Sequence, residues 1–267
     1  MPSKSNRISK KFWSCSVPLF FTKELIQEIA LLYHIFASPQ RFFWGMPIGH
    51  LIPRDASYSS WGDSSVDSGG GFSPCLRFWW FLDWPPEIRR CTIRFLTSLT
   101  GGSDELISIN ALEFVVVILN YAASTLAILQ DTATYSVPNP ILLNYADNTS
   151  AVAWTKRAAR SSPTGKALGR ILCNLLITSP LALQSEHVAG IENTIADKIS
   201  RSSLHESHTC PNFRSLEQEF PILSSCHRYH PSRELLSSIY QALSSGSGPV
   251  QIKRILLGHF APDKHIG

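Results

Sequence analysis

The stretch NYADNTSA (residues 144–151) follows the apolar run Ile141-Leu142-Leu143 and leads into a segment that can continue as a helix. A buried strand that ends in an acid and turns into a helix presents that acid, here Asp147, at the carboxyl edge of a sheet. Proteins of the α/β class usually place ligands and metals at such edges. A lone acid there is more often a helix cap, so the meaning of Asp147 depends on the acids that accompany it.

Two strands and a glycine run are predicted upstream of this stretch. Residues 60–65 can form a short strand that carries Asp63, and residues 72–84 can form a long aromatic strand. Between them, Gly69-Gly70-Gly71 can supply the positive φ values that a hairpin turn needs. A phosphate-binding glycine loop requires a helix to follow, so the hairpin is favoured.

An apolar helix with an acid near its start comes next. A short basic helix at 85–99 and a short strand at 106–109 are predicted before it. Asn110 opens the apolar helix, and Asn110 and Glu113 have the spacing of a capping box, which explains Glu113 as well as a functional role does. The uncharged residues 114–130 number about 17, the short limit for a membrane span, and a buried core helix is favoured.

The second half of the chain supplies another strand and another acid. After Asp147 come a helix broken at Ser161-Ser162-Pro163 and a second helix that ends near Pro180. Residues 181–188 alternate well enough for a strand, and residues 193–201 form a short amphipathic helix that carries Asp197. The resulting order of strands and helices predicts an α/β protein.

If the predicted three-stranded meander lies beside the strand that ends at Asp147, four acids can meet at one edge of the sheet. They are Asp63, Glu113, Asp147 and Asp197. Clustered carboxylates repel one another, so such a cluster persists only if cations neutralise it, and hard divalent ions such as Mg²⁺ or Mn²⁺ fit best. Two such ions about 4 Å apart stabilise the attacking water and the leaving oxygen of a phosphodiester displacement.

Four motifs together resemble the ribonuclease H domains of long-terminal-repeat retroelements. Gly62-Asp63-Ser64-Ser65 followed by Gly69-Gly70-Gly71 resembles their first catalytic strand and hairpin, and Ala111-Leu112-Glu113 resembles their Glu-bearing helix start. The stretch YADNTSA (residues 145–151) is similar to their third-acid motif. The most diagnostic piece is HVAGIENTIADKISR (residues 187–201), which is similar to their His-x-x-Gly-x-x-Asn-x-x-Ala-Asp-x-Leu-Ser-Arg close.

The resemblance covers about residues 55–202 and implies a ribonuclease H-like fold. That fold has a mixed five-stranded sheet, an antiparallel meander plus parallel strands, flanked by helices. The chain resembles the C-terminal part of the reverse transcriptase of a gypsy-like or DIRS-like retrotransposon. Residues 1–50 would be a helical lead-in left from the polymerase or its connection, residues 51–202 the ribonuclease H-like domain, and residues 203–267 a partly irregular extension.

Carried over residue by residue, the resemblance implies that Asp63, Glu113, Asp147 and Asp197 bind two Mg²⁺ (or Mn²⁺) ions. His187 falls where some members have a histidine that helps product leave. The implied enzyme cleaves the RNA strand of RNA/DNA hybrids, and its implied partners are that hybrid and an upstream polymerase domain of the same element, with no membrane.

The chain departs from the family pattern in one spacing. The first two acids are 113 − 63 = 50 residues apart, longer than we expect for a compact member. Asp55 and Asp67 are alternative first ligands. Asp63 is preferred because it precedes the Ser-Ser pair and the glycines at the family's spacing.

Recognition of a hybrid depends on contacts to 2′-hydroxyls on one strand and to phosphates on the other. Basic and amide side chains on the predicted helices can supply such contacts, and an ordinary solvated helix face explains the basic ones equally well. These candidates are Arg89, Arg90, Arg94, Lys156, Arg157, Arg160, Lys166, Arg170, Asn148 and Asn193.

Composition bounds the class of protein and its compartment. The chain is 44% hydrophobic and 16% charged, which allows a substantial core, and its net charge of +4 permits a polyanionic partner. Six scattered cysteines without a Cys-x-x-Cys motif suit a reducing compartment. Pro18 interrupts the apolar N-terminal patch, so a secretory signal is disfavoured. We expect an intracellular protein, cytoplasmic or nuclear.

Several other functions stay open at this stage. The main alternative is a truncated, catalytically inactive retroelement relic that binds nucleic acid only. An integrase-like relative is disfavoured by Glu113 and the closing motif, and a membrane protein rests on residues 114–130 alone. A zinc site would need ligands from the C-terminal His and Cys residues, whose spacing matches no common pairing; these are His205, His208, Cys210, Cys226, His227 and His230.

Overall fold

The structure, a computed structural model, describes residues 26, 29–30, 33, 55–97, 107–131, 137–157, 162–202, 214–246 and 260–262. The chain divides into two compact units, Met1–Arg41 and Phe42–Gly267. The described residues of the first unit are helical, as predicted for the lead-in. The rest of that lead-in and its predicted boundary at residue 50 lie outside the described residues.

A mixed sheet forms the centre of the second unit. Its strands are β1 (Tyr58–Ser64), β2 (Ser68–Ser73), β3 (Phe78–Asp83), β4 (Ile141–Ala146), β5 (Ala182–His187) and β6 (His227–Pro231), and β7 (Phe260–Pro262) pairs with β6. The order is β5-β4-β1-β2-β3-β6-β7. β1, β2 and β3 form an antiparallel meander, whereas β4 and β5 run parallel to β1, and β6 runs parallel to β3.

These pairings confirm the predicted α/β class and the mixed sheet flanked by helices. The predicted number of five strands is wrong, because β6 and β7 extend the sheet beyond β3. A strand edge carries unpaired backbone N–H and C=O groups, and the C-terminal segment satisfies those of β3. Sequence periodicity carries no signal for which segment fills such an edge.

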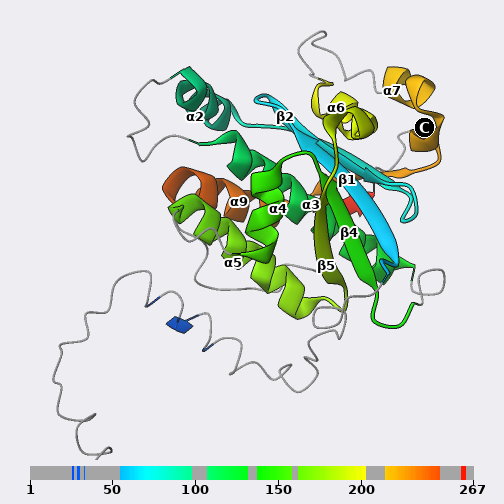
Figure 1. Ribbon diagram of the computed structural model, residues 1–267, viewed down its shortest axis with the longest axis horizontal. Helices are drawn as coiled ribbons and strands as arrows, with labels where there is room; N and C mark the ends of the chain where they lie inside the picture. Colours follow the sequence, from blue (N-terminus) through cyan, green and yellow to red (C-terminus); the bar gives the residue numbers. More distant parts are fainter. Residues whose placement is uncertain are drawn as a thin grey trace, which may run out of the picture. The chain divides into compact units, whose positions relative to one another are not determined.

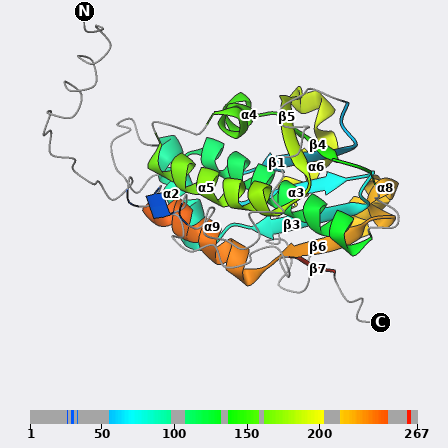
Figure 2. The same ribbon diagram turned by 90° about the horizontal axis from the view of Figure 1, so that it is seen from below.

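Helices cover both faces of the sheet (Figures 1 and 2). On one face lie α2 (Pro86–Thr97), α3 (Ile109–Gln130), α4 (Thr149–Lys156), α5 (Pro163–Thr178) and α9 (Arg233–Ser245), and on the other lie α6 (Thr194–Ser200), α7 (Arg214–Glu219) and α8 (Pro221–Ser224). The larger apolar core joins the sheet to α3, α5 and α9. A smaller one, which includes Phe72, Trp79 and Ile199, joins it to α6, α7 and α8.

The glycine run lies inside β2 rather than in a turn, so the predicted hairpin position is wrong. Residues 65–67 make the turn between β1 and β2, and Gly69-Gly70-Gly71 pair with β3. A Cβ at Gly70 would collide with Ile199 of α6, and one at Gly71 would collide with Asn120 of α3. The glycines therefore let helices on both faces approach the strand closely. The long strand predicted at 72–84 is divided by a turn at 74–77.

α3 begins differently from the prediction. Ser108 is its N-cap, and the Ser108 side chain accepts a hydrogen bond from the backbone N of Ala111. The described residues 107–108 are not strand and Ile109 is helical, so the strand predicted there is wrong. Since Ser108 caps the helix, the capping box of Asn110 and Glu113 is wrong as well.

α3 is the central helix of the larger core. It is long and apolar enough to cross a membrane, but 94% of its most apolar window is buried inside the protein. This burial agrees with the predicted core helix. Asn120, in its middle, accepts a hydrogen bond from Trp80 Nε1 at 2.8 Å and donates one to Asn144 Oδ1 at 2.9 Å. The buried amide thus ties α3 to β3 and β4.

The segment predicted as a partly irregular extension belongs to the same unit. Among its described residues, Leu235, Ile239 and Leu243 of α9 lie in the larger core, and α9 packs on α5. Tyr229 of β6 packs edge-on against Phe78 of β3. The α/β unit therefore continues past residue 202.

Candidate metal centre

Three of the predicted acids meet at the carboxyl edge of β1 and β4. Asp63 lies near the end of β1, and Asp147 directly follows β4. Because the parallel register pairs Trp61 with Tyr145, the same offset places Asp63 opposite Asp147. Glu113 arrives from the start of α3, and one carboxylate oxygen of each acid lies within 4.8 Å of the others.

Glu113 reaches the sheet edge from helix α3, and only one of its two carboxylate oxygens accepts a hydrogen bond within the described part of the chain. Its side chain is 4% exposed, and Oε1 accepts a hydrogen bond from the backbone N of Ser64 at 3.2 Å. Oε2 is buried and has no hydrogen-bond partner within the described ranges of the chain. Burial, followed by the negative charges of Asp63 and Asp147, raises the pKa of Glu113 well above its ordinary value.

Asp63 is held from the opposite face of the sheet. It is 4% exposed and accepts a hydrogen bond from the Ser200 hydroxyl at the end of α6. Burial raises the pKa of Asp63 to about 6; the Ser200 hydrogen bond and Arg201 oppose this rise, and the charges of Asp147 and Asp197 add to it. Strands β1 and β4 and helix α3 thus bring the three acids together, and α6 orients Asp63 from the other face.

This arrangement fits a hard divalent cation. All the candidate ligand atoms are carboxylate oxygens, which Mg²⁺ and Mn²⁺ prefer. The orphaned Glu113 Oε2 is a buried acceptor, and an uncompensated buried acceptor is costly. A cation between the acids would satisfy this oxygen and remove the repulsion. The buried acidic triad can therefore hold a metal ion.

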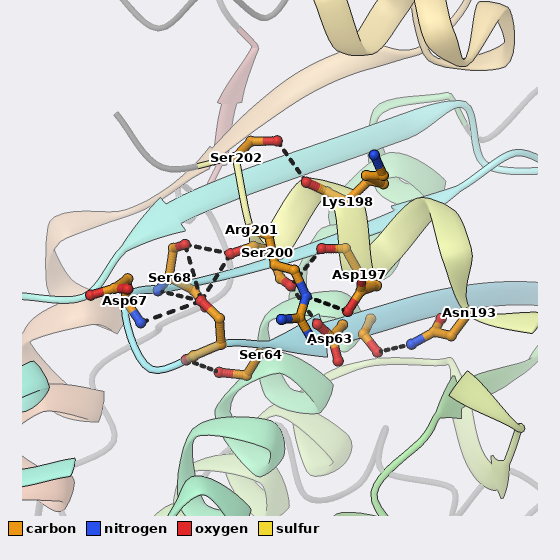
Figure 3. Close-up of polar contacts among 12 residues, drawn as sticks. Asp63, Ser64, Asp67, Ser68, Asn193, Asp197, Lys198, Ser200, Arg201 and Ser202 are labelled. Atoms are coloured by element: carbon orange, nitrogen blue, oxygen red, sulfur yellow. Dashed lines mark hydrogen bonds and ion pairs between the residues drawn. The ribbon is translucent and has the colours of Figure 1, made fainter. Parts of the chain in front are cut away.

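Asp197, the fourth predicted acid, lies beside the triad without joining it. Its Oδ1 accepts a hydrogen bond from Arg201 Nε at 2.6 Å, as Figure 3 shows. Its charge nevertheless helps to raise the pKa of Asp63, so the two carboxylates interact. The predicted convergence is confirmed for three acids, and the fourth is paired with an arginine instead.

Ser200 and Arg201 are site residues that the sequence reasoning did not single out. The backbone O of Ser200 accepts hydrogen bonds from the hydroxyls of Ser65 and Ser68, so α6 is fastened to the turn between β1 and β2 (Figure 3). The signal was available, because both residues close the motif at 187–201.

His187 ends β5 at the same edge of the sheet. It pairs with Ala146 of β4, its side chain is exposed, and its Nε2 lies 3.0 Å from the backbone O of Asp147. The imidazole is thus placed next to the triad, as predicted, while its role in product release stays a prediction.

Two of the predicted nucleic-acid residues make contacts within the protein. Asn148 is the N-cap of α4, where its Oδ1 accepts from the backbone N of Ser150 and of Ala151 and its Nδ2 donates to Asn110. Asn193 is 1% exposed and donates to the backbone O of Gly62 at 3.1 Å. A buried amide has no surface to offer a ligand, so this scaffold role replaces the predicted contact of Asn193.

The predicted basic residues differ in their exposure. Arg89 pairs with Asp67 at 3.8 Å and Arg90 with Glu87 at 3.6 Å, weak ion pairs of the surface kind. Arg170 is 8% exposed, which leaves little of it for a phosphate. The others are exposed Lys156 and Arg157, half-buried Lys166, and Arg94 and Arg160, whose side chains lie outside the described part of the chain.

The acids are the one candidate metal group among the described residues. Of the possible zinc ligands, His205, His208 and Cys210 lie outside those residues. Cys226, His227 and His230 are described and form no such group.

Comparisons of the chain with family models, with curated proteins and with solved structures found no match.

Proposed function

We propose that this chain is a metal-dependent endoribonuclease of the ribonuclease H kind, which cleaves the RNA strand of RNA/DNA hybrids as part of a retrotransposon reverse transcriptase. The observation that carries the proposal is the convergence of Asp63, Glu113 and Asp147 at one sheet edge. The meander followed by two parallel strands supports it, since this topology is compatible with a ribonuclease H-like fold. The motif at 187–201 supplies the retroelement part of the proposal.

The chain's own residues would prepare the site for hydrolysis. Asp63, Glu113 and Asp147 would hold divalent ions, with Asp197 adding a fourth carboxylate. Two bound Mg²⁺ or Mn²⁺ ions would supply activation of the attacking water and stabilisation of the departing 3′ oxygen. The Ser64 amide orients the Glu113 carboxylate, and the Ser200 hydroxyl orients that of Asp63. The protein thus positions these two ligands before an ion binds.

The proposed substrate is the hybrid that the resemblance of the motifs implies. Cleavage of RNA opposite DNA requires one strand with 2′-hydroxyls and one without them. Exposed His187 lies beside the acids, where it can meet the product phosphate. Exposed Lys156 and Arg157 lie at the C-terminal end of α4, about 12 Å along the helix from Asp147. At that distance they can contact phosphates that flank the cleaved bond.

The test is cleavage of an RNA/DNA hybrid labelled on each strand in turn, with Mg²⁺ or Mn²⁺ and with EDTA as control. We expect metal-dependent cutting of the RNA strand alone. Asp147→Asn should lower the rate by a factor on the order of 100 or more, because it removes a ligand of the ions while preserving side-chain shape. Glu234→Gln, which makes the same carboxylate-to-amide change at an exposed residue of α9 outside the triad, is the matched control and should retain most activity.

The outcomes separate the proposal from its main alternative. Tight hybrid binding with no cleavage by the folded wild type would favour an inactive relic that only binds nucleic acid. Cleavage that persists in EDTA or in Asp147→Asn would contradict the assignment of the site.

A further inference from the structure

The pair Asp197–Arg201 lies at the rim of the triad and involves the fourth acid. Arg201 Nε donates to Asp197 Oδ1 at 2.6 Å across one turn, and the side chains are 66% and 35% exposed. Figure 3 shows the Arg201 side chain turned back toward Asp197 and Asp63. The Asp197 carboxylate is therefore already neutralised by a cation that belongs to the chain itself.

The charge of Arg201 acts on more than its direct partner. The charges of Asp63 and Asp147 also stabilise the Arg201 guanidinium, and Arg201 in turn favours the charged form of Asp63. A divalent ion between Asp63 and Asp197 would have to share this space with the guanidinium. Like charges at such short range repel strongly, so the ion and Arg201 compete for Asp197.

Within the described part of the chain, no basic side chain forms an ion pair with Asp63, Glu113 or Asp147, and Arg201 acts on Asp63 and Asp147 through its charge alone. Glu113 is 4% exposed, its Oε2 is buried without a hydrogen-bond partner among the described residues, and one of its carboxylate oxygens lies within 4.8 Å of those of Asp63 and Asp147. An incoming ion would meet ligands that the fold has already assembled. The two places for a cation are thus unequal in this chain.

We infer that Arg201 occupies the place of a second cation, so that the protein binds one divalent ion at the triad and a second one only when Arg201 releases Asp197. This inference rests on the proposed metal centre and adds an order of binding to it. A phosphate of the nucleic acid is the natural alternative partner for the freed guanidinium, because arginine binds carboxylates and phosphates with the same planar fork. Arrival of the substrate would then favour binding of the second ion.

The test counts Mn²⁺ ions bound to the full chain without nucleic acid, from the electron paramagnetic resonance signal of the free ion. Wild type should bind one ion tightly and a second one much more weakly. Arg201→Gln should tighten the second ion roughly three- to tenfold, the range expected for removing a partly exposed competing charge, and should change the first ion less. Asp197→Asn should keep the first ion and lose the second.

Lys198→Gln is the matched control. It removes a positive charge from the same helix, where Lys198 pairs with Glu219 at 3.4 Å, without touching Asp197. It should behave like wild type. Arg201→Lys keeps the charge but loses the planar fork, so it should tighten the second ion less. Arg201→Ala also removes the charge, and it decides the question if Arg201→Gln does not fold.

Different results overturn different parts of the account. An unchanged second ion in Arg201→Gln (or, where that variant fails to fold, in Arg201→Ala) would overturn the competition, as would an equal gain in Lys198→Gln. Two equally tight ions in wild type would overturn the order of binding. No bound Mn²⁺ in wild type would overturn the metal centre itself, and this inference with it.

Discussion

Asp63 is more costly to ionise in the folded chain than in the unfolded one, since its pKa rises from 3.8 to about 6. A carboxyl group whose pKa is higher in the folded state stabilises the fold at pH values below its unfolded-state pKa. That stability is lost as the pH rises through its folded-state pKa. In EDTA, we expect Asp63 to cost about 1–3 kcal/mol of unfolding free energy between pH 4 and pH 7. Urea denaturation across that range measures it, and Asp63→Asn should lack this component.

Divalent ions should reverse this loss. Because Mg²⁺ would bind the charged carboxylates, it should stabilise wild type at pH 7 and leave Asp63→Asn nearly unchanged. Equal stabilisation of both proteins by Mg²⁺ would show that the ion binds elsewhere.

The identity of the triad could be predicted from sequence, but the state of each carboxylate could not. Asp63 and Asp147 follow strand patterns, so their arrival at one edge depends only on strand order. Glu113 was ambiguous because its spacing also suits a cap, and only the position of Ser108 removes that ambiguity. The pairing of Asp197 with Arg201 depends on side-chain rotamers and on the charges nearby, which a linear motif does not carry.

At the scale of elements, strand β2 needs glycine at positions where helices pack closely against it. A Cβ at Gly71 would collide with Asn120 of α3, so Gly71→Ala should cost about 1–3 kcal/mol through overpacking. Gly169, in α5, is the matched control, since a Cβ there meets nothing within 4 Å. Gly169→Ala should stabilise by about 0.5–1 kcal/mol. Urea denaturation of both variants checks the pair, and equal effects would contradict the close packing of α3 on β2.

The glycine run also shows what patterns cannot predict about an element. Three consecutive glycines are typical of a turn, and the turn chemistry is the stronger local signal. In this chain they form a strand, because helices on both faces need close approach at that place. Requirements of this kind come from the packed layers, which become visible only when the whole sheet is assembled.

At the scale of the whole molecule, the C-terminal segment completes the α/β unit. Truncation after Ser202 removes β6 and α9, takes Leu235 and Ile239 out of the larger core, and uncovers the side of α5 on which α9 packs. We expect the shortened chain to lose cooperative unfolding in urea. Truncation after Gly246 removes only β7 among the described elements and should keep it. Cooperative unfolding of the shorter chain at wild-type stability would contradict this role.

Strands at the places of β1, β4 and β5 could be predicted from the sequence, whereas their order in the sheet was only a condition of the prediction. The edge formed by β6 and β7 could not, because pairing with β3 depends on long-range contacts rather than on local pattern. The same long-range contacts bring α3 and α6 to opposite sides of Asp63 and so complete the metal centre.

The most direct test of the central claim is the chemistry of the RNA ends that the full chain produces from an RNA/DNA hybrid in Mg²⁺. Attack by water with departure of the 3′ oxygen leaves a 3′-hydroxyl on one fragment and a 5′-phosphate on the other, and mass spectrometry identifies both. We predict these ends for wild type and no fragments for Asp147→Asn. Fragments ending in a 2′,3′-cyclic phosphate, or an uncut hybrid with folded wild-type protein and Mg²⁺, would contradict the account.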